Sequence, residues 1–222
     1  MYKKELNIGI IMNHYDSYIQ SSVSPLYYAC QDGKIDFIAE LLKSPDIDVN
    51  QVYELGETVL YLACRLGKLD IVQLLLKQTG INVNKSNKHF NAYLNEDNGV
   101  TPLMGAINGY ITDVRVNIVR ALLEHPDIDV NKSNNDGDTP LGLAVKSYNI
   151  DIVHMLLEKS DVSSFLENEQ LFIDNLEADY DLSRISDIFK DIKICLGKTE
   201  SSLTLANHKK SGVFRQHILI KL

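Results

Sequence analysis

The sequence predicts an all-α fold in which about four helix-turn-helix repeats stack into a solenoid, followed by a helical C-terminal segment. Two observations carry this prediction. The phrase PDIDVN occurs at residues 45–50 and again at 126–131, with a shortened form, INVN, at 81–84. The apolar residues between these phrases recur at the three-to-four spacing of helices that bury one face. Such self-similarity at a fixed period is the signature of stacked supersecondary units.

Two of the units align along their whole length. SPLYYACQDGKIDFIAELLKSPDIDVN at 24–50 lies over ETVLYLACRLGKLDIVQLLLKQTGINVN at 57–84. Leu26 then aligns with Leu60, and the same offset of 34 residues holds throughout the two segments. The chain therefore repeats a complete structural unit and not only a short phrase.

Two further units begin with Thr-Pro-Leu and occupy residues 100–131 and 138–162. The third unit is displaced by two insertions. Removing residues 88–96 leaves NKSN-DNGVTP, which matches NKSNNDGDTP before the fourth unit, so an excess of 9 residues lies there. A second excess of 4 residues lies within 110–116, between the two apolar runs of the third unit.

Each unit is predicted to form two short helices and an extended turn. A threonine before proline starts the first helix, because its hydroxyl can cap exposed N–H groups and proline fits the first turn. Gly33 and Gly67 allow the left-handed backbone that ends that helix. In the second helix, Ile71, Leu74 and Leu75 keep the spacing of a buried stripe. DVN and the polar residues after it then turn towards the next unit.

The pattern TPL followed by alanine stands in the third and fourth units, with SPL and TVL in its place in the first and second. It resembles the ankyrin repeat with its T-P-L-H-x-A motif. The resemblance implies an ankyrin-repeat solenoid with β-turn fingers, and a non-catalytic adaptor, inhibitor or scaffold that binds another protein. The family's histidine is replaced by Tyr27, Tyr61, Met104 and Gly142, so we expect its side-chain network to be absent or replaced. Tyr110 and Tyr148 stand where the first two units have glycine.

The repeated phrase is interpreted as a packing element, because a single helix pair cannot enclose its own apolar residues and must stack. Its packing residues are Ile47, Val49, Ile81, Val83, Ile128 and Val130. We divide the chain into an N-terminal cap at 1–22, four repeats at 23–162 and a C-terminal helical cap at 163–222. Within that cap we expect one helix over SSFLENEQLFIDNLEADY and another over DLSRISDIFKDIKICLG, beginning at Asp181 or Ser183 and ending at Gly197.

Composition narrows the class of protein. The 45% hydrophobic and 23% charged fractions are typical of a soluble globular chain. A net charge of -8 argues against nucleic-acid binding, which needs a basic surface. No apolar run approaches the ~20 residues of a membrane-spanning helix. Three unpaired cysteines favour a reducing, cytoplasmic compartment, and we expect a monomer.

Motifs for catalysis or cofactors do not support an enzyme. GKT at 197–199 lacks the earlier glycine of a phosphate-binding loop, where Ile192 stands instead. The six histidines show no HExxH or paired metal spacing, and no serine lies in GxSxG. Cys30 and Cys64 occupy equivalent repeat positions and are expected to be small, unpaired core residues. We therefore predict no cofactor, no metal site and no catalytic residue.

The partner-binding surface is predicted at the finger tips and at the ends of the first helices. Apolar and aromatic groups on adjacent tips are typical of interface anchors. The finger residues are Val52, Tyr53, Leu55, His89, Phe90, Tyr93 and Leu94. The adjoining helix-end residues are Gln31, Asp32, Arg65, Leu66, Asn108, Lys146 and Ser147.

Two alternatives remain open at this point. In the first alternative to an adaptor, scaffold or inhibitor, the chain is a translocated microbial effector that targets a host protein. In the second, it carries a small functional or enzymatic module in 163–222. The insertion at 88–96 has an equally open alternative, because the enlarged loop can also pack back onto its own stack.

Overall fold

The computed structural model describes residues 25–53, 56–87, 90–91, 96–97, 99–109, 112–159 and 181–195. The chain divides into two compact units, residues 1–180 and 181–222. The described helices of the first unit are α2 Pro25–Asp32, α3 Ile35–Leu41, α4 Val59–Arg65, α5 Leu69–Leu76, α6 Pro102–Ile107, α7 Thr112–Leu123, α8 Pro140–Lys146 and α9 Ile150–Leu157. Two short strands, β1 Phe90–Asn91 and β2 Glu96–Asp97, lie between α5 and α6. The second unit contributes α12 Leu182–Cys195.

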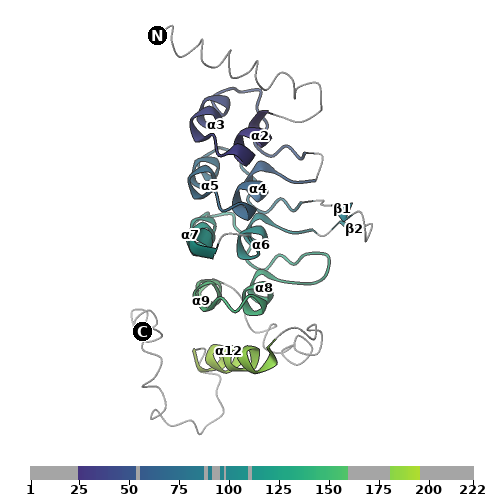
Figure 1. Ribbon diagram of the computed structural model, residues 1–222, viewed down its shortest axis with the longest axis vertical. Helices are drawn as coiled ribbons and strands as arrows, with labels where there is room; N and C mark the ends of the chain where they lie inside the picture. The colour runs from purple at the N-terminus through teal and green to yellow at the C-terminus, as the bar shows by residue number, and fades with distance from the viewer. Residues whose placement is uncertain are drawn as a thin grey trace. The chain divides into compact units, whose positions relative to one another are not determined.

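The first unit is a stack of four helix pairs, as the sequence predicts. Helices α2, α4, α6 and α8 form one column, α3, α5, α7 and α9 form the other, and the fingers extend beside the first column (Figure 1). Each first helix packs on the next first helix, and each second helix on the next second helix. The core between the columns includes Leu26, Ile38, Leu60, Leu75, Leu103, Ile118 and Ile152. The described part therefore confirms the predicted repeat solenoid.

Threonine starts the first helix of the second, third and fourth repeats. Thr58, Thr101 and Thr139 have extended backbones, and their hydroxyls accept hydrogen bonds from backbone N–H groups three residues later. The oxygen-to-nitrogen distances are 3.1, 3.3 and 3.1 Å. A threonine cap supplies about 1 kcal/mol per helix. The predicted start signal, threonine before proline, is thus confirmed at Thr101 and Thr139, and Thr58 caps its helix in the same way before Val59.

The first helices end where the sequence predicts a left-handed residue. Gly33 has φ of 72° and Gly67 has φ of 70°. In the fourth repeat the same position is Tyr148, which keeps the left-handed backbone with φ of 54°. A side chain with Cβ pays about 1 kcal/mol or more for this conformation, so the fourth repeat is strained where the first two are not.

Both insertions are accommodated without disturbing the stack. The nine-residue excess lies in the second finger, whose base is closed because Asn87 N–H donates to the Val100 carbonyl at 2.9 Å. Beyond that base, β1 pairs with β2 in antiparallel register, with Phe90 opposite Asp97. The four-residue excess lengthens α7 to 12 residues, against 8 in α5 and α9. Four residues add about one helical turn, so the buried stripe of α7 stays in register.

The asparagine that ends the repeated phrase forms hydrogen bonds to the turn of the following repeat. Asn50 Nδ2 donates to the Gly80 carbonyl at 2.8 Å, and Asn50 Oδ1 accepts from Asn82 N–H at 2.7 Å. One carboxamide therefore joins the first repeat to the second. Within its own turn, Asn50 N–H donates to Asp48 Oδ1 at 2.9 Å, which holds the turn in shape.

The next repeat makes the same set of bonds. Asn84 Nδ2 donates to the Asp127 carbonyl at 2.6 Å, and Asn84 Oδ1 accepts from Asp129 N–H at 2.8 Å. Lys85 Nζ and Lys132 Nζ reach back to the carbonyls of Asn50 and Asn84 at 2.7 and 2.8 Å. We call these bonds of Asn50, Asn84, Lys85 and Lys132 the asparagine ladder. Of the apolar positions in the phrase, Val49, Ile81, Val83 and Val130 are buried, while Ile47 and Ile128 are partly exposed.

Helix α12 confirms the predicted helix over DLSRISDIFKDIKIC. Asp181 Oδ1 accepts from the N–H groups of Ser183 and Arg184 at 3.1 and 3.2 Å, so Asp181 is the predicted start. The Ser183 hydroxyl donates to the same oxygen at 2.7 Å, and this bond, followed by that of the Arg184 N–H, lowers the pKa of the Asp181 carboxyl. The apolar stripe of α12 is buried and consists of Ile185, Ile188, Phe189 and Ile192.

Several expectations lie outside the described residues. They are the cap at 1–22, the helix expected over SSFLENEQLFIDNLEADY and the stop at Gly197, so the capping roles stay predictions. Among the residues that the structure describes, no helix is long and apolar enough to cross a membrane.

Candidate partner-binding surface

Each finger is closed at its base by backbone hydrogen bonds. In the first finger, Tyr53 N–H donates to the Glu57 carbonyl at 3.0 Å. In the third, Asn134 N–H donates to the Asp138 carbonyl at 2.9 Å, and Asn134 Oδ1 accepts from Asp138 N–H at 2.7 Å. Asn87 uses its side chain in the same way in the second finger, where Val100 N–H donates to its Oδ1 at 3.0 Å. All three fingers therefore project from bases of common geometry.

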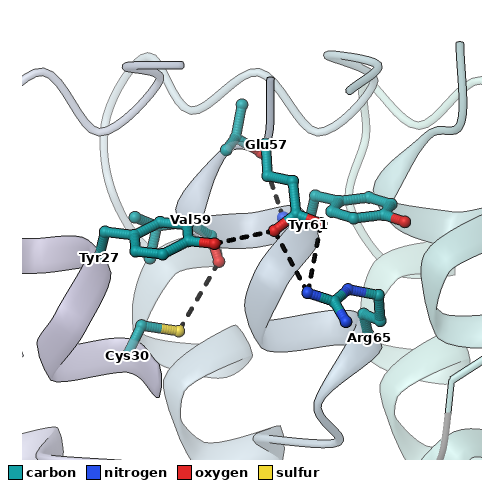
Figure 2. Close-up of polar contacts among 7 residues, drawn as sticks. Tyr27, Cys30, Glu57, Val59, Tyr61 and Arg65 are labelled. Atoms are coloured by element: carbon teal, nitrogen blue, oxygen red, sulfur yellow. Dashed lines mark hydrogen bonds and ion pairs between the residues drawn. The ribbon is translucent and has the colours of Figure 1, made fainter. Parts of the chain in front are cut away.

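A buried carboxylate ties the first finger to the neighbouring first helices. Glu57 is 1% exposed and accepts a hydrogen bond from the Tyr27 hydroxyl at 3.0 Å (Figure 2). Arg65 Nη2 lies 3.2 Å from Glu57 Oε1 and 3.3 Å from Oε2. A buried charge is tolerated only when it is paired and hydrogen-bonded, and here α2 and α4 supply the two partners. We call Tyr27, Glu57 and Arg65 the finger clamp.

Tyrosine rings extend this clamp along the stack. The Tyr27 ring packs on the Tyr53 ring with centroids 4.9 Å apart, and the Arg65 guanidinium lies 6.0 Å from the centroid of Tyr61. Tyr61 in turn covers Gly105 of the next repeat, where an added Cβ would lie 2.8 Å from the ring. Burial, and then the Glu57 charge, raise the pKa of Tyr27, so its hydroxyl stays a donor. At the position of the family's histidine, Tyr27 and Tyr61 thus contact the neighbouring repeat instead.

A second ion pair of the same spacing lies in the fourth repeat. Lys146 Nζ is 2.8 Å from Asp138 Oδ1, eight residues away in sequence like Arg65 and Glu57. Both side chains of this pair are about a quarter exposed, at 22% and 24%. Our sequence analysis missed both pairs. The available signal was an acidic residue directly before the capping threonine and a basic residue seven positions after it.

Most of the predicted helix-end residues reach the surface. Gln31, Asp32 and Asn108 are exposed, whereas Arg65, Leu66, Lys146 and Ser147 are partly exposed. The charged groups of Arg65 and Lys146 are already engaged by Glu57 and Asp138. Among the predicted helix-end residues, the structure therefore leaves Gln31, Asp32 and Asn108 as the exposed polar side chains.

Tyr53 requires a correction. We predicted it as a surface contact at a finger tip, but it is 6% exposed and its ring packs on Tyr27. The physical reason is its position at the finger base, where the second and third fingers have asparagine and where the first helix supplies an aromatic neighbour. Val52 beside it is partly exposed, and its role in partner binding stays a prediction.

The remaining predicted finger residues lie beyond what can be placed. Leu55, His89, Tyr93 and Leu94 are outside the described residues, and Phe90 is described only through its backbone in β1. Their role in partner binding stays a prediction. Among the described residues, no group of three or more His, Cys, Asp or Glu side chains is placed to hold a metal ion.

The two cysteines of the repeats are free and buried, as predicted. Cys30 Sγ lies 3.8 Å from the Val59 carbonyl, to which it donates. Burial raises the pKa of Cys30 to about 12, partly opposed by Lys68 and supported by Glu57. Burial likewise raises the pKa of Cys64 well above that of a free thiol.

These thiols predict a loss of stability at alkaline pH. Their pKa values are raised by folding, so the unfolded chain ionises first, above about pH 8.5. Stability is therefore complete below that pH and falls as pH rises towards 12, by at most about 1.4 kcal/mol per pH unit for each thiol. Urea unfolding from pH 7 to 10.5 measures this slope. Cys30→Ala with Cys64→Ala should flatten it, and an unchanged slope in that variant would refute the assignment.

Comparison with known families agrees with this architecture. The family model described as ankyrin repeats (3 copies) matches residues 6–87 and 88–165, which is more than half of the chain. A comparison with curated proteins finds no match. Ankyrin repeats are generally protein–protein interaction modules. With four stacked helix pairs, threonine-capped first helices and finger turns in register, the chain belongs to the ankyrin repeat family.

Proposed function

We propose that the protein is a non-catalytic interaction module, acting as an adaptor, scaffold or inhibitor that binds a partner protein. In this proposal the partner contacts the fingers and the concave face formed by the first helices α2, α4, α6 and α8. A stacked repeat offers an extended surface whose side chains vary while the backbone stays regular. One observation carries the proposal: fingers with backbone-bonded bases lie beside a row of accessible helix-end side chains.

The electrostatics of this row favour recognition by hydrogen bonds and apolar contacts. Arg65 and Lys146 alternate along the stack with the uncharged Gln31 and Asn108, and each cation faces its own carboxylate. A compensated charge gives little long-range steering. We therefore expect affinity to depend only weakly on salt, with specificity set by side chains that the partner desolvates.

We also propose a cellular compartment and an oligomeric state for the protein. The free, buried thiols of Cys30 and Cys64 support a reducing compartment, which we propose to be the cytoplasm. We propose a monomer that engages one partner along the stack.

A matched pair of variants tests the binding face. Gln31→Arg with Asn108→Arg places two large cations on the proposed face, whereas Gln73→Arg with Asn117→Arg makes the same changes at exposed positions on α5 and α7. Affinity purification with the wild-type chain identifies the partner, and titration calorimetry then measures Kd. We expect Kd to rise at least about tenfold for the first variant, the scale of losing one good contact.

The second variant is the control for charge and folding. Its Kd should stay within about twofold of wild type, because surface substitutions outside the interface change neither the contacts nor, to any large extent, the stability of the fold. Equal effects of both variants, with unchanged melting temperatures, would place the binding surface elsewhere. Phe90→Ser with Tyr93→Ser, measured in the same assay, separates a contribution of the second finger from that of the helix ends.

A further inference from the structure

We propose that Asn108, which caps the end of α6 in the third repeat, is a deamidation site. In this reaction an asparagine loses its side-chain ammonia and becomes aspartate or isoaspartate, so the residue gains a negative charge. The site is identified by the residue that follows Asn108 and by the exposure of its side chain. It is independent of the proposed function, and only its consequence for a partner rests on that function.

The residue that follows Asn108 is Gly109. Deamidation begins when the backbone nitrogen of the following residue attacks the asparagine Cγ. A bond between that nitrogen and Cγ forms, the bond between Cγ and Nδ2 breaks, and Nδ2 leaves as ammonia with the proton of the attacking N–H. Water then opens the succinimide ring, at Cγ to give aspartate or at the backbone carbonyl carbon to give isoaspartate. Glycine obstructs the attack least, because it has no side chain.

The Asn108 carboxamide is more accessible than the carboxamides of the asparagine ladder. Asn108 is exposed, so its Cγ can be approached from solvent. Asn50 and Asn84 are only partly exposed, and each carboxamide forms two hydrogen bonds with the following turn. Asn84 is moreover followed by Lys85, whose side chain obstructs the attack. The ladder asparagines are therefore protected and serve as internal references.

The attacking nitrogen of Gly109 is held weakly. Its N–H donates to the Ala106 carbonyl at 3.4 Å, which is longer than the roughly 2.9–3.0 Å of a typical hydrogen bond. At the equivalent positions of the second and fourth repeats, Leu66 N–H and Ser147 N–H donate to carbonyls four residues earlier at 2.9 Å. A nitrogen in a long hydrogen bond loses less when it turns towards Cγ.

Ring closure requires the end of α6 to open. Asn108 has φ of -93° and ψ of 4°, and the position of a Cβ on the buried Gly109 would lie 3.0 Å from the Arg65 carbonyl oxygen. This packing slows the reaction. However, α6 has 6 residues, against 7 or 8 in the other described first helices. Ends of helices fray, and such a local opening costs far less free energy than unfolding of the stack.

Deamidation changes the charge of a row of equivalent side chains, one from each repeat. The row consists of Gln31, Arg65, Asn108 and Lys146. Arg65 and Lys146 are each paired with a carboxylate of their own repeat. A new carboxylate at position 108 therefore adds a charge to a neutral place between two compensated cations. If the proposed function holds, a partner that fits the carboxamide must desolvate this charge and binds less tightly.

Peptide mapping of the full chain tests the site. The protein is incubated at mildly alkaline pH, both native and unfolded in urea, and tandem mass spectrometry follows the conversion of each asparagine. Fragment ions separate Asn108 from Asn98, which also precedes a glycine. In the native chain Asn108 should convert at least about tenfold faster than Asn84, whose carboxamide must first break two hydrogen bonds. Conversion no faster than at Asn84, or an intact native Asn108 when the unfolded chain has fully converted there, would overturn the proposal.

Two variants separate the site from its effect on binding. Asn108→Gln keeps a carboxamide, but its longer side chain closes the ring far more slowly, so conversion at position 108 should be lost. Continued conversion at that position in this variant would also overturn the proposal. Asn108→Asp carries the charge of the product, and its Kd for the captured partner should be about tenfold above that of Asn108→Gln. Equal Kd values, with conversion observed in the wild-type chain, would support the deamidation site and contradict the proposed binding face.

Discussion

Replacing Glu57 by alanine should lower the free energy of unfolding by roughly 3 kcal/mol. The carboxylate is 1% exposed and is the shared acceptor for Tyr27 and Arg65. Its removal takes the anion from the Arg65 guanidinium, whose side chain is 26% exposed, and the acceptor from the hydroxyl of the buried Tyr27. Desolvation of unpaired groups is then no longer compensated. Urea unfolding at neutral pH measures the loss.

The fourth repeat supplies the control for this experiment. Asp138→Ala breaks an ion pair of the same sequence spacing, but both of its side chains are about a quarter exposed, so water can replace the lost partner. We expect a cost of about 1 kcal/mol. Glu57→Gln should fall between the two variants, because the amide oxygen still accepts from Tyr27. Equal costs for the two alanine variants would mean that burial of the finger clamp contributes nothing.

The repeat fold could be predicted from the sequence because the repeats align with one another residue by residue. The 34-residue offset fixed which helices are equivalent, and the capping threonines and Gly33 and Gly67 fixed their ends. The two insertions were located correctly because a repeat supplies its own reference: any excess must lie where the alignment breaks. The outcome is visible in the closed base of the second finger and in the longer α7.

The candidate site was less predictable because its contacts cross between repeats. Whether Tyr53 points to solvent depends on the ring of Tyr27 in the first helix, a neighbour that is distant in sequence. The same holds for Asn50, whose bonds to Gly80 and Asn82 require the layer spacing to be known. Periodicity identifies which residues face a neighbouring repeat, but it does not identify the partner atom. Identifying the partner atom requires the three-dimensional structure.

The two ion pairs bear on how the binding face is organised. Glu57 and Asp138 each hold the base of a finger to the cation of an adjoining first helix, whereas the second finger has Val100 and Asn108 at these positions. In the described part of the second finger, the base is closed by the backbone and side-chain bonds of Asn87. As long as Asn87 is kept, substitutions further out in that finger should leave its base closed.

Replacing Tyr53 by alanine should cost roughly 3 kcal/mol of unfolding free energy, the lower end for removing a buried aromatic ring. The ring is lost together with its contact to Tyr27, while the backbone bond from Tyr53 N–H to the Glu57 carbonyl remains available. The variant therefore isolates side-chain packing from finger closure. Val52→Ala is the adjacent control, and its partly exposed side chain should cost under about 1 kcal/mol.

The same variant distinguishes a packing role from a direct contact with the partner. If Tyr53 acts only through packing, the folded fraction of Tyr53→Ala should bind with a Kd within about threefold of wild type once stability is corrected for. Combining it with Glu57→Ala should give a cost below the sum of the single variants, because both residues contact Tyr27 and neighbouring effects are not additive. A stable Tyr53→Ala protein with a large rise in Kd would restore Tyr53 as a binding residue and require the first finger to rearrange on binding.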